Sequence, residues 1–180
     1  LDEFMALITE QGAELGNIIE DLLVAARADI GTLSVKPVPL DVADQLRTVL
    51  ALHSSKSSGR LSVSVRGDRA EAIIDPLRFR QIVRNLVTNA FRYGGDHIWA
   101  EVEVRGQNVM AAIVDDGPGV PAGSERAIFE AYGRGSNSIT TPSSVGLGLA
   151  VSRQLAELMQ GRLDYRRVDG LSRFELTLPL

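Results

Sequence analysis

The chain has 180 residues, 44% hydrophobic and 23% charged, a composition typical of a globular protein with one domain plus an appendage, or with two small units. The net charge of −4 gives no support for a nucleic-acid or anionic-membrane partner, and the absence of cysteine excludes disulfides, thiol chemistry and cysteine-liganded zinc. No apolar run of about 18 residues and no signal peptide is visible, and because Leu1 stands inside an apolar repeat we expect a part of a longer chain.

A seven-residue apolar repeat predicts one long amphipathic helix over residues 1–29. The apolar stripe, here called the seam, has two sets of positions. One set, with residues seven apart, is Leu1, Ile8, Leu15 and Leu22, and the alternate set is Phe4, Ile18 and Ala25. This seam favours half of a helical hairpin that dimerises into a four-helix bundle. The alternative is a helix that lies on its own domain. Gly31 is expected to end the helix.

The segment that follows predicts short elements. Two prolines make residues 33–40 an extended linker or edge strand, and Asp41 is the expected cap of a helix that reaches about Ser54. Residues 61–65 alternate as a strand, with 72–74 as a candidate short partner. The Asp75-Pro76 pair predicts the start of the next helix.

That next helix carries the most unusual face of the chain. Asn85, Asn89, Arg92 and Tyr93 lie on one side of it, whereas Ile82, Val83, Leu86 and Ala90 form an inward side. Asn is a mediocre helix former, so two carboxamides one turn apart indicate a ligand. Their neutral oxygens suit Mg²⁺, which usually arrives with phosphates. An ordinary polar surface helix is the alternative.

The remaining elements surround a long irregular tract. Strands are expected over 98–104 and 109–114, joined around Gly106, and a closing hairpin over 163–167 and 172–178 turns around Gly170. Between them a helix is expected over 146–160. Residues 115–144 are rich in Gly, Ser, Thr and Pro, with a brief helical patch over 125–130, and such a tract is typical of a functional lid.

Two glycine motifs flank this tract. Asp115 follows an apolar strand and can accept a hydrogen bond from an exocyclic amine, while Gly117 and Gly119 allow backbone to approach a planar ring closely; a simple turn is the alternative. Gly146-Leu147-Gly148 opens a helix with unhindered N–H groups, which form a phosphate seat, although a G-x-G alone is a weak signal.

Together these residues resemble the sensor histidine kinases of two-component signalling, in the GHKL superfamily that also holds gyrase, Hsp90 and MutL. Residues 85–90 look like the N box, 115–119 the first glycine box, 128–135 the F box and 144–149 the second glycine box. The first helix is similar to the second helix of the family's dimerisation and histidine-phosphotransfer domain. The resemblance therefore implies a dimerisation segment over 1–33 and a catalytic ATP-binding domain over 34–180.

The resemblance also implies a fold and a set of roles. The fold would be an α/β two-layer sandwich of the Bergerat type, a mixed sheet with three helices on one face. Asn89 would bind Mg²⁺, and Asn85 would support the metal–phosphate region. Arg92 and Tyr93 would contact phosphates, and Asp115 would read the adenine amine. Gly117 and Gly119 would shape the adenine pocket, Arg134 would reach the terminal phosphate, and Gly146, Leu147 and Gly148 would seat the triphosphate of ATP.

The sequence departs from the family in two places. Ser144 stands where the second glycine box usually begins with Gly, and the phosphoacceptor histidine is expected on a helix before residue 1, so self-phosphorylation by this chain alone is not expected. The two histidines, His53 and His97, are interpreted as ordinary surface or packing residues.

One residue separates the branches of the superfamily. Its ATPases and its serine kinases place a glutamate base at the position of Asn85, which cannot take a proton. The sequence therefore favours transfer of the γ-phosphoryl group to a histidine, then to an aspartate of a response regulator. A non-catalytic dimerisation module and an anti-sigma-type serine kinase are the alternatives. The family further implies a homodimer and a cytoplasmic location as part of a plasma-membrane sensor.

Overall fold

The structure is a computed structural model that describes residues 2–54, 61–66, 70–130 and 146–180. Its helices are α1 (Asp2–Asp29), α2 (Val42–Ser54), α3 (Pro76–Tyr93), the 3-10 turn η1 (Ala127–Phe129) and α4 (Gly148–Leu158). Its strands are β1 (Val38–Asp41), β2 (Leu61–Arg66), β3 (Glu71–Ile74), β4 (Ile98–Arg105), β5 (Asn108–Asp115), β6 (Arg162–Val168) and β7 (Leu171–Pro179).

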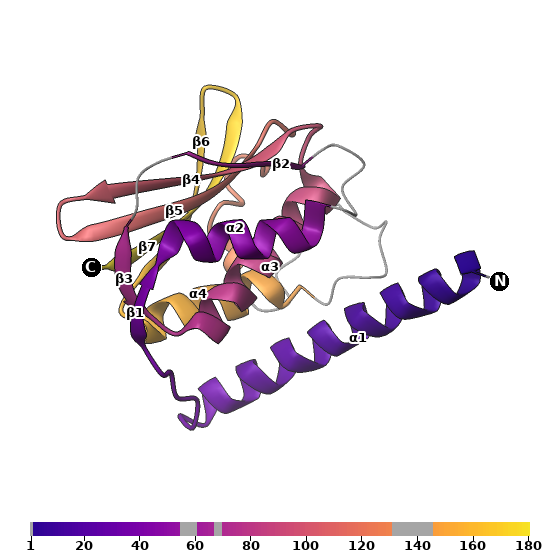
Figure 1. The fold of residues 1–180 in the computed structure, drawn as a ribbon, viewed down its shortest axis with the longest axis horizontal. Helices are drawn as coiled ribbons and strands as arrows, with labels where there is room; N and C mark the ends of the chain where they lie inside the picture. Colours follow the sequence, from indigo (N-terminus) through magenta and orange to yellow (C-terminus); the bar gives the residue numbers. More distant parts are fainter. Residues whose placement is uncertain (1, 55–60, 67–69, 131–145) are drawn as a thin grey trace.

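A mixed five-stranded sheet, in the order β2-β4-β5-β7-β6, forms one layer. The β2–β4 pair is parallel and the other pairs are antiparallel. Helices α2, α3 and α4 cover one face of this sheet (Figure 1). The expected two-layer α/β sandwich with three helices on one face is confirmed.

The predicted pairing of 72–74 with the strand over 61–65 is wrong. β3 pairs with β1 in a separate two-stranded antiparallel sheet, while β2 joins β4. Pro39 lacks an N–H donor, so β1 suits an edge position next to a single partner. This pairing brings the backbone N–H of Lys36 within 2.7 Å of an Asp75 carboxylate oxygen.

Helix α3 begins and packs as the sequence predicts. The Asp75 side chain caps it by accepting the N–H groups of Leu77 and Arg78 at 2.9 and 3.2 Å, and Pro76 occupies the first turn. The predicted inward residues of this helix are all buried in the core between helices and sheet: Ile82, Val83, Leu86 and Ala90. The polar face therefore has a fixed orientation, away from the sheet.

Helix α1 lies along the far side of the helix layer (Figure 1). It ends at Asp29, and Gly31, whose φ is +67°, follows it as the expected C-terminal glycine. Val24 and Asp21 are buried against the domain, whereas large apolar side chains of the seam remain exposed: Phe4, Ile8, Leu15 and Leu22. Within the described residues, none of the helices combines the length and the apolar character needed to cross a membrane.

Candidate nucleotide-binding site

The polar face of α3 meets the start of α4. The Asn85 side-chain nitrogen donates to the Gly148 carbonyl at 3.2 Å and lies 3.3 Å from the Ser152 hydroxyl. A Cβ atom added to Gly148 would lie 3.6 Å from Asn85, so the two elements are in contact at this point. The structure thus brings together the N box and the second glycine box, which stand about 60 residues apart in the sequence.

The beginning of α4 has the backbone properties of an anion seat. Gly146 has a φ of +71°, Leu147 is buried, and the N-cap residue Leu147 makes no side-chain hydrogen bond to the first N–H groups of the helix. The N–H donors of a first helical turn and the positive end of the helix dipole favour a phosphate at this position.

Asp115 lies beside Gly94, just after the C-terminal end of α3. Its side chain is 4% exposed and accepts the N–H groups of Gly117, at 2.9 Å, and of Gly95. Burial raises the pKa of this carboxyl, and the two backbone hydrogen bonds oppose that effect. A buried carboxylate with remaining acceptor capacity can recognise an exocyclic amine.

Gly117 allows a close backbone approach, although not in the way the sequence indicates. A Cβ atom at this position would lie 2.6 Å from backbone atoms of both Gly94 and Gly95. The glycine therefore lets the loop after β5 pack directly against the chain that leaves α3. This packing fixes Asp115 relative to the polar face of α3.

Asn89 lies one helical turn from Asn85, between the two ends of the site. It is half-buried, and its side chain makes no hydrogen bond to another described residue. No cluster of three or more His, Cys, Asp or Glu side chains within the described ranges could hold a metal on its own. Because Mg²⁺ usually keeps several waters and binds one or two protein oxygens together with phosphates, a single carboxamide oxygen fits it.

Helix α1 binds to the same polar face. The sequence supports a helix on its own domain only as the alternative, and it does not predict contact with this face. Arg92 forms an ion pair with Glu14. Arg84 binds Glu20 at 2.9 Å and Asp21 at 3.3 Å, and the Asn85 amide donates to Asp21 at 3.3 Å. Burial raises the pKa of Asp21, and its hydrogen bond to Gln81 is the largest opposing effect. Two residues predicted to serve the nucleotide are thus in contact with α1.

Phe129 of the predicted F box anchors the chain at the edge of the tract 131–145. Its ring lies edge-on to Phe174, with centroids 6.4 Å apart, and the Arg153 guanidinium lies 3.8 Å from its centroid.

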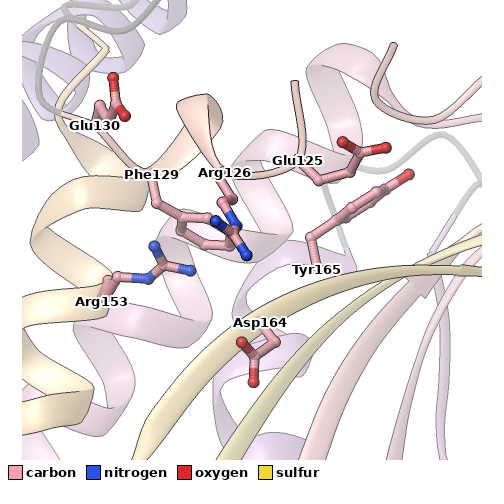
Figure 2. Close-up of a pocket in the computed structure, with 7 residues that line it drawn as sticks. All are labelled: Glu125, Arg126, Phe129, Glu130, Arg153, Asp164 and Tyr165. Carbon is pink, nitrogen blue, oxygen red and sulfur yellow. The ribbon is translucent and has the colours of Figure 1, made fainter. Parts of the chain in front are cut away.

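A cleft of about 500 Å³ opens beside Phe129 (Figure 2). It is lined by Glu125, Arg126, Phe129, Glu130, Arg153, Asp164 and Tyr165. These described lining residues include none of those predicted to bind nucleotide. Arg134 and Ser144 lie outside the described residues.

His97 has a specific contact that the sequence does not indicate. Its ring nitrogen lies 2.7 Å from an Asp116 carboxylate oxygen, and its backbone N–H donates to the other oxygen at 2.9 Å. These hydrogen bonds lower the pKa of Asp116. The pair ties the start of β4 to the loop that carries Asp115.

Known proteins resemble most of this chain in sequence. The family described as histidine kinase-, DNA gyrase B-, and HSP90-like ATPase matches residues 74–180. Sensor protein KdpD of Escherichia coli K12 is 29% identical over 165 residues, which cover 90% of this chain and 18% of that protein. The chain spans 18%, 32% and 45% of three such curated relatives.

Solved structures show the same fold. Histidine kinase AdeS of Acinetobacter baumannii superposes with a TM-score of 0.78 at 23% identity, covering 98% of this chain and 83% of that one. A structure of full-length ShkA in complex with AMPPNP has a TM-score of 0.78 at 25% identity, covering 99% of this chain and 38% of that one.

Proposed function

Because the chain belongs to the family of histidine kinase-, DNA gyrase B- and HSP90-like ATPases, we propose that it is the ATP-binding catalytic part of a sensor histidine kinase. It would pass the γ-phosphoryl group of Mg-ATP to a histidine on a dimerisation helix, for onward transfer to an aspartate of a response regulator. The curated relatives are sensor kinases, and the AMPPNP complex of ShkA supports ATP as the ligand.

One observation carries this proposal. Helix α3 connects the start of α4 with the buried Asp115 carboxylate: Asn85, in the middle of α3, contacts Gly148, and Gly94, just after the C-terminal end of α3, packs against Asp115. Nine residues of helix separate these two contacts by about 14 Å. The adenine would bind at Asp115 and the phosphates at the start of α4, with Asn89 between them.

The residues of this site position the nucleotide and neutralise its charge. Asn89 would hold Mg²⁺ through its side-chain oxygen, and the metal supplies charge neutralisation at the phosphates. Arg92 and Tyr93 would contact the phosphates, and Arg134 would reach the terminal one. Asn85 cannot act as a general base. A neutral imidazole is already a nucleophile, so transfer to histidine needs less help from a base than transfer to water or to a serine hydroxyl.

The N-terminal helix would contribute the dimerisation element. We assign residues 1–33 to it and residues 34–180 to the catalytic domain. The exposed apolar seam of α1 fits a second helix and a second copy of this chain. Location on the cytoplasmic side of the plasma membrane, as part of a sensor, is the arrangement we propose for the whole protein.

The test is phosphoryl transfer from γ-labelled ATP to a separately supplied histidine-bearing dimerisation helix. We expect Mg²⁺-dependent labelling that is labile in acid and stable in base, as a phosphohistidine is. The same helix with its histidine replaced by alanine should remain unlabelled. Labelling that survives acid would support the serine-kinase alternative. Nucleotide binding without any labelling would support the non-catalytic module.

A further inference from the structure

The loop that follows Asp115 has the sequence pattern of a tight turn, but its first carbonyl and its fourth N–H bind side chains rather than each other. In Gly117-Pro118-Gly119-Val120, proline stands second and Gly119, with a φ of +78°, stands third, which is typical of a type II turn. Such a turn often joins the first carbonyl to the fourth N–H. Here the Val120 N–H donates to the Tyr165 hydroxyl at 3.0 Å, and Arg167 donates to the Gly117 carbonyl at 2.8 Å.

Both of these side chains come from β6, two residues apart, and therefore project from the same face of that strand. The Tyr165 ring packs on Phe174 of β7, with ring centroids 5.1 Å apart. The Arg167 nitrogen that binds Gly117 also donates to the Ser172 hydroxyl at 2.9 Å. Ser172 is buried, and it pairs across the sheet with Asp115. We call Tyr165 and Arg167 the β6 clamp. The clamp is thus anchored on the sheet next to Asp115.

Gly119 is required by this clamp. A Cβ atom on it would lie 2.8 Å from the Tyr165 hydroxyl and would also collide with Arg167. The close approach that the sequence assigned to a planar ligand is therefore made, at this residue, by the two β6 side chains. Positive φ at the same position independently favours glycine.

The clamp reaches Asp115 through Gly117. The Gly117 N–H donates to Asp115, and its carbonyl accepts from Arg167, so this residue is fixed from both sides. We propose that Arg167 and Tyr165 are positioning residues that aim the Asp115 carboxylate and thereby set the preference for a base with an exocyclic amine. This inference rests on the proposed function, because it needs a nucleotide at Asp115.

The experiment compares ADP with IDP, in which a carbonyl replaces the exocyclic amine of the base. Dissociation constants are measured by calorimetry for the wild type, Arg167→Met, Tyr165→Phe and the control Arg166→Met. Arg166 is the adjacent cation of β6, and it pairs with Glu175 rather than with the turn. The selectivity ratio is the affinity for ADP divided by the affinity for IDP. Unfolding without nucleotide is measured for each variant, since a merely structural role would change stability but not this ratio.

We expect Arg167→Met to weaken ADP binding about tenfold or more, as for loss of one charge-assisted hydrogen bond, while IDP binding changes less. Tyr165→Phe should lower the ratio of ADP affinity to IDP affinity by only a few-fold, because it loses the hydroxyl but its ring still packs on Phe174. Arg166→Met should keep the wild-type ratio. If Arg167→Met does not fold, the Tyr165→Phe ratio decides.

Three results would overturn the inference, and they are distinguishable. An Arg167→Met ratio equal to that of the wild type removes the role in selectivity, even if both nucleotides bind more weakly. An equal fall in the ratio for Arg166→Met assigns the effect to charge on β6 rather than to the clamp. A wild type that binds neither nucleotide overturns the proposed function as well.

Discussion

Replacing Asp115 by asparagine should separate the stability of the domain from its ligand binding. The carboxyl is almost fully buried, and burial is the main cause that raises its pKa above the ordinary value of 3.8. The folded state therefore holds the proton more tightly than the unfolded state does. The contribution of Asp115 to stability is greatest below pH 3.8 and is lost as the pH rises through the raised pKa. At neutral pH the charged side chain costs stability, and Asp115→Asn removes that cost.

The loss of binding is estimated from the hydrogen bonds of the carboxylate. Two backbone N–H groups, of Gly117 and Gly95, already bind it and leave acceptor capacity for one exocyclic amine. A hydrogen bond to a charged group contributes about 1.5–3 kcal/mol, so its loss weakens ADP binding about 10- to 150-fold. An asparagine that turns its NH₂ group toward the amine would place the loss at the upper end of this range.

The assay combines calorimetry with ADP at pH 7 and urea unfolding without nucleotide at several pH values between 5 and 8. The matched control is Asp116→Asn, which removes the neighbouring carboxylate, a group that binds His97. It should retain ADP affinity within about twofold, as expected for a position that makes no ligand contact. Unchanged ADP affinity in Asp115→Asn, or a large loss of stability in that variant at pH 7, would refute the reasoning.

Three further substitutions test the rest of the site. Asn89→Ala should abolish the Mg²⁺-dependent part of nucleotide binding, and calorimetry that finds unchanged Mg-ATP affinity would contradict the metal assignment. Glu14→Gln frees Arg92 from a partly exposed ion pair that contributes about 0.2–1 kcal/mol. If Glu14 and ATP compete for Arg92, ATP affinity should rise up to about fivefold, and calorimetry that finds unchanged or weaker binding would argue against this competition. Gly117→Ala forces backbone apart and should lower the unfolding free energy by about 1–3 kcal/mol, whereas the control Gly12→Ala, with open space around it, should not destabilise.

The predictable part of this structure depends on local chemistry. Apolar periodicity predicts α1 and α3, the Asp75-Pro76 pair predicts the start of α3, and Gly170 lies at the hairpin turn. Each of these signals lies within a few residues of the element that it specifies. The burial of Asp115 also follows, because it ends a strand whose other residues from Val109 onward are apolar and buried.

The remaining part depends on partners that are distant in the sequence. Arg84 and Arg167 look like ordinary surface cations, because their partners stand about 63 and 50 residues away. The predicted partner of 72–74 was wrong for the same reason, since short strands carry little information about pairing. Asp21 offers a weak signal: a carboxylate inside an apolar helical stripe indicates a specific contact. The contacts of α1 with Asn85 and Arg92 could not be predicted from motifs.

The most direct test of the central claim is calorimetry of the wild type with a non-hydrolysable ATP analogue, with and without Mg²⁺. We expect saturable binding to one site per chain, tighter with Mg²⁺ than without it, and weakened about 10- to 150-fold in Asp115→Asn. Equal affinity with Mg²⁺, without Mg²⁺ and in Asp115→Asn would place the nucleotide away from Asp115 and Asn89. The absence of binding in the wild type would contradict the account and favour a non-catalytic dimerisation module.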